Sequence, residues 1–385
     1  MASSRKEMKT GLVLTGGGAR AAYQVGVLKA VAKLVPANAP NPFAIISGTS
    51  AGAINATTLA IHANDFQKGV RRLNMVWRNF EVGHVFRADT IGILKAGLHW
   101  LAALMFGGLG RFNPVSLLDR APLLKLLQDH LDCSQIQNGI DQGFLDALSI
   151  TVSGYNSGES VSFYQGLAEY SPWRRARRIG VPSEICLQHL MASSAIPFLF
   201  RAERINREYF GDGSMRQNAP LSPAIHLGAE RLLVIGVHKD TTTTDRTQVV
   251  AYPSMARIAG HVLNSIFLDS LDGDLERLRR INATVERANK GRLMKSDIGL
   301  KKIDALVISP SQDLGEIASQ HIQRLPRPLR FLLHGIGAIN NNDNSFVSYL
   351  MFDRAYSREL ISLGYADAMR QKDQLRQLVD RRSQV

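Results

Sequence analysis

Cysteine is scarce in this chain, which has two cysteines among 385 residues. Cys133 and Cys186 are too few to build the disulfide framework of a small secreted domain, and neither lies in a metal-ligand spacing. The sequence also lacks an uninterrupted apolar run of about 20 residues, the length that a helix needs to span a bilayer. The composition therefore predicts neither a disulfide scaffold, nor a metal or other cofactor, nor a membrane-spanning helix.

The amino-terminal residues lack the long apolar segment of a signal peptide. The apolar run that precedes Gly16 contains only four residues, which is too short for such a segment. We therefore expect the protein to reside in the cytoplasm or to lie peripherally on the inner face of a membrane.

Acidic residues are outnumbered by basic ones, since 33 Asp and Glu face 46 Lys and Arg, which gives a net charge of +13. Basic residues gather at 173–180 and 324–330. A field of this sign attracts anionic surfaces, so an anionic membrane is an expected partner, although a single cluster is more often a solvated face. No nucleic-acid-binding pattern accompanies the charge, so nucleic acid is not an expected partner. The oligomeric state stays open.

The most apolar segment covers residues 91–110, but Lys95 and His99 interrupt it. About 15 uncharged residues follow Lys95, fewer than a bilayer span requires. Two interpretations stay open. One is a helix buried in the core, and the other is a lid or interfacial helix that lies in the bilayer surface. Trp100 and Phe106 suit the second interpretation.

Ser50 stands in a sequence that favours a catalytic role. Apolar residues at 43–46 predict a buried strand and residues 51–62 predict a helix, so the intervening GTSAG is a G-x-S-x-G sequence in a strand–turn–helix context. Gly48 and Gly52 carry no Cβ, which lets the helix pack close to the strand while Ser50 takes an unusual backbone conformation. This context predicts a nucleophile elbow, and an ordinary helix cap is the alternative.

A glycine loop upstream is a candidate oxyanion hole. Gly16, Gly17 and Gly18 stand between a predicted strand and a predicted helix. Successive glycines let backbone N–H groups point at an anion with no side chain in the way. Arg20, at the head of the helix, would add positive charge or brace the loop.

The same loop matches a relaxed dinucleotide-binding fingerprint, G-x-G-x-x-A, but the rest of that motif is missing. The second strand ends without the carboxylate that holds the ribose. No G-K-[ST] follows the glycines, so a Walker-type phosphate loop is not expected either.

A serine nucleophile needs a base, and two candidates follow Ser50 in the chain. Asp212 lies in the sequence GDGS, where a glycine-flanked carboxylate in a partly dry cleft would gain basicity, although Asp-Gly is also a common hairpin turn. His238 is the last residue of a buried strand predicted over 231–238, and the order Ser50, Asp212, His238 matches a conventional triad.

The ordered set of GGGAR, GTSAG and GDGS resembles the patatin-like phospholipase family, whose members are lipid acyl hydrolases with a Ser–Asp dyad. The resemblance implies Ser50 as the nucleophile, Asp212 as the base, and the glycine loop with Arg20 as the oxyanion hole. Ser214 departs from the pattern, because the family often has glycine or alanine there.

The resemblance implies an α/β fold: a three-layer α/β/α hydrolase core with a mostly parallel central sheet. We expect residues 9–240 to form the catalytic domain. Residues 241–385 are predicted to be a helix-rich region packed on the core, with a late strand near 303–309. Residues 147–157 and 160–165 predict a pair of strands across an Asn-Ser-Gly turn.

The sequence thus predicts a serine acyl hydrolase of the phospholipase A or lysophospholipase type, which cleaves fatty acyl esters of membrane lipids. Two alternatives stay open. One is a conventional Ser-Asp-His esterase that uses His238. The other is a non-catalytic membrane-binding protein on a retained hydrolase fold.

Overall fold

The fold is described from a computed structural model, which covers residues 8–87, 105, 116–239, 269–290, 300–335, 339 and 345–380. The apolar segment 91–110, with its core, lid and interfacial interpretations, lies outside these residues except for position 105.

A single mixed sheet organises the chain, with the strand order β10-β9-β1-β2-β3-β4-β6-β5 and a side branch in which β8 pairs with β3 and β7 with β8. The five strands from β10 to β3 are parallel to one another, and β4 and β8 run antiparallel to β3. The strands are β1 (Thr10–Leu14), β2 (Ile45–Thr49), β3 (Ala147–Gly154), β4 (Ser160–Gly166), β5 (Trp173–Arg175), β6 (Arg178–Pro182), β7 (Glu203–Ile205), β8 (Glu208–Asp212), β9 (Arg231–Ile235) and β10 (Asp304–Ile308).

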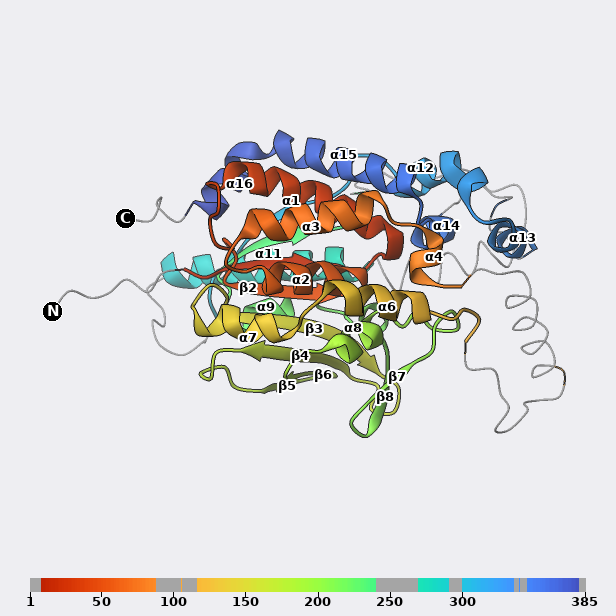
Figure 1. Ribbon diagram of the computed structural model, residues 1–385. Coiled ribbons are helices and arrows are strands. Elements are labelled where there is room, and N and C mark those ends of the chain that lie inside the picture. The colour runs from red at the N-terminus through yellow and green to blue at the C-terminus, as the bar shows by residue number, and fades with distance from the viewer. Residues whose placement is uncertain are drawn as a thin grey trace, which may run out of the picture.

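Helices cover both faces of the sheet, which makes the three layers of the α/β/α core that was expected. Alternate strand residues point to opposite faces, so Leu12 and Leu14 join one apolar cluster while Val13 joins another. The first cluster packs under α1, α2, α3 and α15, and Figure 1 shows α1, α3 and α15 stacked on this side. The second cluster packs against α9 and α11.

The helices of the described residues vary from single turns to α11, which has 22 residues. They are α1 (Ala22–Leu34), α2 (Ala51–Ile61), α3 (Phe66–Arg78), α4 (Val82–Val85), α6 (Ala121–His130), α7 (Ser134–Asp141), α8 (Leu187–Ser193), α9 (Ser222–His226), α11 (Asp269–Lys290), α12 (Leu314–His321), α13 (Arg327–Gly335), α14 (Ser345–Leu350), α15 (Arg354–Arg370) and α16 (Lys372–Val379). Short 3₁₀ turns occur at η1 (Gly18–Ala21), η3 (Gly213–Met215) and η4 (Ile322–Arg324).

The local sequence explains several helix starts. Asp65 caps α3 by accepting a hydrogen bond from the backbone N–H of Lys68, and Asp353 caps α15 through two backbone N–H groups. The cap places α3 so that Leu73 and Trp77 face the core. This is the helix that forms one wall of the cleft described below.

The structure excludes one alternative interpretation and corrects one predicted strand end. The Asp-Gly pair at 212–213 is not a hairpin turn, because β8 ends at Asp212 and the turn of the β7–β8 hairpin lies at Asn206, which has φ 54°. The strand predicted to end at His238 ends at Ile235 instead. The antiparallel pairing of β3 with β4 confirms the predicted strand pair.

The region after residue 240 shares the core of the preceding part. β10 extends the sheet beside β9, and α15 contributes Tyr356, Leu360 and Ile361 to the same apolar cluster as α1. Where a boundary falls between a catalytic domain at 9–240 and a carboxyl-terminal region stays a prediction. Of the helices in the described ranges, none combines the length and the apolarity that a bilayer crossing requires.

Candidate active site

Ser50 lies at the junction of β2 and α2, immediately after the strand ends at Thr49. Its backbone has φ 56° and ψ −129°, a left-handed region that non-glycine residues seldom adopt. This sharp turn puts the side chain at the amino-terminal end of α2, where unpaired N–H groups and the helix dipole favour negative charge. Ser50 is 3% exposed, so its hydroxyl lies in a largely dry environment.

The register of the sheet brings Asp212 to Ser50 across 162 positions of sequence. Thr49 pairs with Thr151 between β2 and β3, and Val152 pairs with Asp212 between β3 and β8. Because β4 pairs along the opposite edge of β3, β2 and β8 meet end to end along one edge, and the Ser50 and Asp212 side chains emerge where these two strands meet. The Ser50 hydroxyl donates a hydrogen bond of 2.6 Å to Oδ2 of Asp212, and Oδ1 accepts from the backbone N–H of Ser214 at 2.9 Å.

The elbow glycines stand where the backbone is crowded. A Cβ on Gly48 would lie 2.6 Å from the carbonyl oxygen of Gly52, and a Cβ on Gly52 would lie 2.6 Å from that of Thr15. Real Cβ atoms do not approach so closely. The absence of both side chains therefore lets α2 pack against the ends of β1 and β2, as the sequence predicted for these positions.

Ser193, at the end of α8, holds the backbone of the elbow. Its hydroxyl accepts a hydrogen bond from the Ser50 N–H at 2.8 Å and donates one to the Thr151 carbonyl at 2.7 Å. Ser193 is fully buried. One side chain thus ties the strained residue to the neighbouring strand, which fixes the direction of the Ser50 hydroxyl.

Burial changes the basicity of Asp212, which has no exposed surface. Desolvation raises the pKa of this carboxyl from 3.8 to about 6, against the opposing effects of the hydrogen bonds from Ser50 and Ser214 and of the Arg120 charge. Arg120 is itself buried and forms an ion pair of 2.8 Å with Glu203. Asp212 is therefore ionised at neutral pH and is a stronger base than an aspartate in water.

The glycine loop lies directly beside Ser50. A Cβ on Gly16 would lie 3.1 Å from the Ser50 Cβ and would collide with the Ser214 hydroxyl. The hydroxyl of Ser214, the residue that departs from the family pattern, therefore fills the space that a side chain at position 16 would need. Gly18 has φ 55° and begins the 3₁₀ turn that leads into α1.

The Arg20 side chain is directed toward α14. Its Nε donates a hydrogen bond of 2.7 Å to the Ser348 hydroxyl, and its guanidinium lies 4.4 Å from the centre of the Tyr349 ring. Of the two roles expected for Arg20, these contacts favour bracing of the loop.

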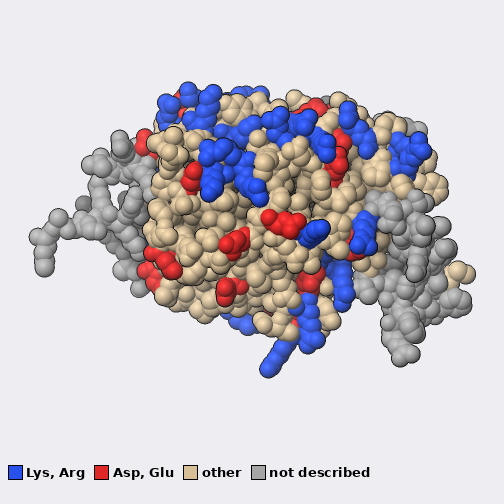
Figure 2. Space-filling model, in the orientation of Figure 1, with Lys and Arg blue, Asp and Glu red and all other residues tan. Residues whose placement is uncertain are grey.

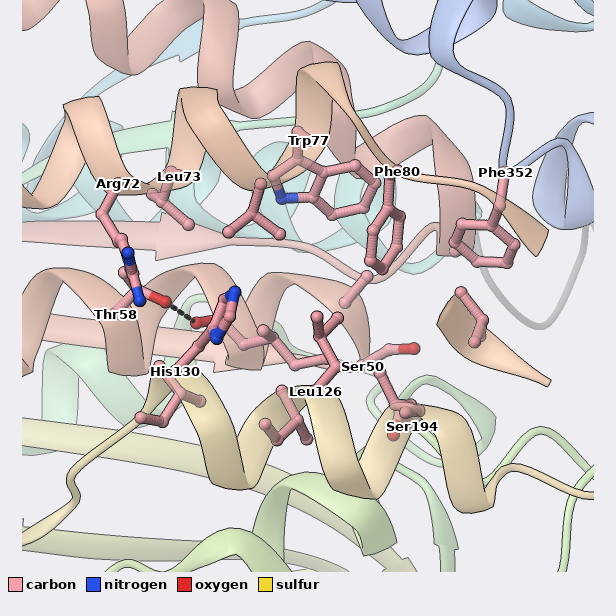
Figure 3. Close-up of a pocket in the computed structure, with 18 of the residues that line it drawn as sticks. Ser50, Thr58, Arg72, Leu73, Trp77, Phe80, Leu126, His130, Ser194 and Phe352 are labelled. Atoms are coloured by element: carbon pink, nitrogen blue, oxygen red, sulfur yellow. Dashed lines mark hydrogen bonds between the residues drawn. The ribbon is translucent and has the colours of Figure 1, made fainter. Parts of the chain in front are cut away.

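An apolar cleft begins at Ser50 and runs between α3 and α6, with α2 as its floor (Figure 3). It encloses about 800 Å³ of space, part of which is open to solvent. Most of its lining is aliphatic or aromatic and includes Ile54, Leu73, Val76, Trp77, Leu123, Leu126, Leu127 and Phe352. Its shape and lining suit a hydrocarbon chain whose reacting end lies at Ser50.

His238 lies three residues past the end of β9, and β1 separates that strand from β2. The Ser50 hydroxyl donates to Asp212 itself, without an imidazole between them. Within the described ranges, no three His, Cys, Asp or Glu side chains gather into a set that could hold a metal ion.

Sequence reasoning missed Ser193 and Arg120. Ser193 belongs to the run MASSA, and Arg120 lies 92 positions before Asp212 in the chain. Neither residue has a local signal of its role, because both act through contacts that the tertiary structure creates.

A family model described as patatin-like phospholipase matches residues 12–225, more than half of the chain. A search of curated proteins found no significant match.

Two similar solved structures are VipD from Legionella pneumophila and human GIVD cytosolic phospholipase A2 in complex with a methyl γ-linolenyl fluorophosphonate inhibitor and terbium chloride. Both are 14% identical to this chain, with TM-scores of 0.35 and 0.40. The matches cover 96% and 97% of this chain but 67% and 59% of those proteins. Likeness at this level adds nothing to what the family model shows.

Proposed function

Because the chain belongs to the patatin-like phospholipase family, we propose that it is a serine acyl hydrolase that cleaves fatty acyl esters of membrane lipids through a Ser50–Asp212 dyad. The observation that carries the proposal is the direct hydrogen bond of 2.6 Å between the Ser50 hydroxyl and Oδ2 of Asp212. This bond lies at the head of an apolar cleft, where an acyl carbonyl would meet the nucleophile.

In the first half-reaction the Ser50 oxygen attacks the acyl carbonyl while its proton passes to Oδ2 of Asp212. The carbonyl oxygen gains negative charge beside the glycine loop and the amino-terminal end of α2. Backbone N–H groups in these two places are the donors that would stabilise the oxyanion. The tetrahedral intermediate then collapses, the C–O bond to the leaving alcohol breaks, and Asp212 returns its proton to that alcohol.

In the second half-reaction water replaces the alcohol. Asp212, ionised again, takes one proton from water as the water oxygen attacks the acyl-enzyme carbonyl. The Ser50–acyl bond breaks on collapse, and Asp212 gives its proton to the serine oxygen. A carboxyl with a pKa of about 6 suits both directions of transfer, since it accepts and releases protons close to neutral pH.

The surface supports an anionic membrane as the site of action. Figure 2 shows Lys and Arg side chains gathered along the upper part of one face, over α1, α3 and α15. The predicted cluster at 324–330 extends into α13, where Phe331 is 80% exposed while Leu329 and Leu333 are buried. An exposed aromatic ring beside cationic side chains suits an interface between lipid and water.

Membrane binding is tested with vesicles that contain anionic lipid. Binding should weaken as salt is added, because salt screens exposed charges. It should weaken further when the exposed Arg324 and Arg327 of the 324–330 cluster are replaced by glutamine, and Phe331→Ala should reduce it at every salt concentration. If binding changes neither with salt nor with any of these substitutions, the basic clusters do not bind the membrane and are ordinary solvated surface.

The catalytic proposal is tested by labelling and turnover. A fluorophosphonate probe should label the wild-type chain and Ser362→Ala, which changes an exposed serine of α15, but should not label Ser50→Ala. Hydrolysis of a lipid panel, followed by mass spectrometry, should fall at least about 10³-fold in Ser50→Ala. Membrane binding without labelling or turnover would favour the non-catalytic alternative.

A further inference from the structure

The end of the cleft that lies away from Ser50 is polar. Figure 3 shows Thr58 of α2, Arg72 of α3 and His130 of α6 together at this end, while Ser50 and Ser194 lie at the other. Each of the three polar residues comes from a different wall. The aliphatic and aromatic lining described above separates them from the nucleophile.

The hydrogen-bonding capacity of these groups is largely unused. Within the described part of the chain, no acidic side chain forms an ion pair with Arg72, whereas its neighbour Arg71 pairs with Asp65. Nδ1 of His130 is buried without a hydrogen-bond partner. The Thr58 hydroxyl donates to the Ile54 carbonyl at 2.9 Å, so it has no proton left to donate to a ligand.

The buried Nδ1 of His130 is unfavourable without a hydrogen-bond partner in an apolar cavity, and the cationic Arg72 lies at the same end. Together they indicate a ligand that would accept hydrogen bonds from both side chains. Arginine and a ring N–H of histidine are both donors, and the guanidinium carries a permanent charge. Their natural complement is a carboxylate, with which arginine forms strong, charge-assisted hydrogen bonds.

The spacing sets the length of the chain that would join the two ends. Ser50 and Thr58 are eight residues apart along α2, which corresponds to about 12 Å at roughly 1.5 Å per residue. Carbon–carbon bonds of about 1.5 Å advance an extended hydrocarbon by roughly 1.25 Å each, so about ten carbons cover that distance.

We propose that Arg72 and His130, at the end of the cleft where Thr58 also lies, bind a carboxylate at the distal end of the acyl chain. The preferred substrates are then esters of dicarboxylic acids with about ten carbons. This inference rests on the proposed function, because it takes Ser50 as the point where the ester carbonyl reacts. It adds a specificity site that selects acyl chains by their far end.

The test compares two soluble substrates that differ only at the distal end: the 4-nitrophenyl monoester of decanedioic acid and 4-nitrophenyl decanoate. The measured quantity is the ratio of their kcat/KM values. Arg72→Met should lower this ratio at least tenfold relative to wild type, equivalent to about 1.4 kcal/mol. Arg72→Lys should retain part of the preference, because it keeps the charge but loses the planar fork.

Arg71→Met is the matched control, since it removes the same charge from the next position of α3, at a side chain that is 62% exposed and outside the cleft. It should leave the ratio unchanged. Among diacid monoesters with 6, 10 and 14 carbons, the wild type should prefer the middle length by the spacing argument above. Equal losses on both substrates in Arg72→Met, or no preference for the middle length, would overturn the proposal.

A binding arm separates this inference from the catalytic proposal. In the Ser50→Ala variant, monomethyl decanedioate should bind more tightly than methyl decanoate by calorimetry, and the difference should disappear when Arg72→Met is added. This result is expected whether or not the wild type turns over any ester. If Arg72→Met weakens only the hydrolysis of anionic lipid vesicles and leaves the binding difference intact, Arg72 contacts lipid phosphate and the carboxylate site is refuted.

Discussion

Replacement of Asp212 by asparagine should abolish turnover and, at neutral pH, stabilise the protein. The amide matches the carboxylate in shape, and its oxygen can still accept from the backbone N–H of Ser214. Its nitrogen can donate to the Ser50 oxygen, but it cannot take the serine proton. The variant therefore loses the base while it removes a charge that the fold buries completely.

The sign and the size follow from the pKa of Asp212, which is about 6 in the folded protein and 3.8 as the reference for the unfolded chain. Between these two values the folded state binds more protons than the unfolded state, so this group makes the wild type less stable as pH rises. The loss of stability caused by ionised Asp212 is absent below about pH 4 and complete above about pH 6. The difference of about two pKa units, at 1.36 kcal/mol each, makes this loss about 3 kcal/mol.

The assay is urea unfolding of wild type and Asp212→Asn at several pH values between 4 and 8. The difference in the free energy of unfolding should be close to zero at the acid end and should grow to about 3 kcal/mol in favour of the variant near pH 7. Other titrating groups are common to both proteins and cancel in the difference.

Ser50→Ala is the control for this experiment, because it removes the nucleophile but keeps the buried carboxylate. It should be inactive without gaining the pH-dependent stability. A difference between wild type and Asp212→Asn that does not change from pH 4 to pH 8 would show that Asp212 is not held at a raised pKa, and the account of its basicity would fail.

Three further predictions concern the surroundings of the dyad. Gly17→Ala puts a Cβ 2.6 Å from Cγ2 of Val237, so kcat should fall more than KM rises, and Val237→Ala should restore part of kcat by making room for the loop. Arg120→Gln removes a charge that lowers the pKa of Asp212, so the acid limb of kcat/KM should move to higher pH; an unmoved limb contradicts this coupling. His238→Ala should keep activity within roughly tenfold, and its loss in a folded variant would restore the triad.

The sequence was sufficient to predict the parts of the site that depend on local geometry. A G-x-S-x-G turn between a strand and a helix needs residues without a side chain at its two glycine positions, here Gly48 and Gly52. Such a turn can therefore be recognised from adjacent residues of the sequence alone. The sequence GDGS was harder, because Asp-Gly is equally typical of a hairpin turn. Only the antiparallel pairing of β8 with β3 shows that Asp212 ends a strand rather than turning one.

Residues that act through long-range contacts were beyond sequence reasoning. Ser193 holds the elbow, Arg120 lowers the pKa of Asp212, and both depend on elements brought together by the sheet. The same holds for the polar end of the cleft. Thr58, Arg72 and His130 lie on three helices, and each side chain alone resembles an ordinary residue of an amphipathic helix.

The raised pKa of Asp212 changes which experiment can separate a dyad from a triad. An unperturbed histidine base has a pKa near 6.5, and a buried Asp212 with a pKa of about 6 would give an acid limb at nearly the same pH. A pH profile of the wild type therefore does not identify the base. Geometry favours Asp212 as the base, since its carboxylate accepts a hydrogen bond directly from the Ser50 hydroxyl. The same desolvation that raises the pKa of Asp212 toward that of histidine also makes this aspartate basic enough to act without histidine.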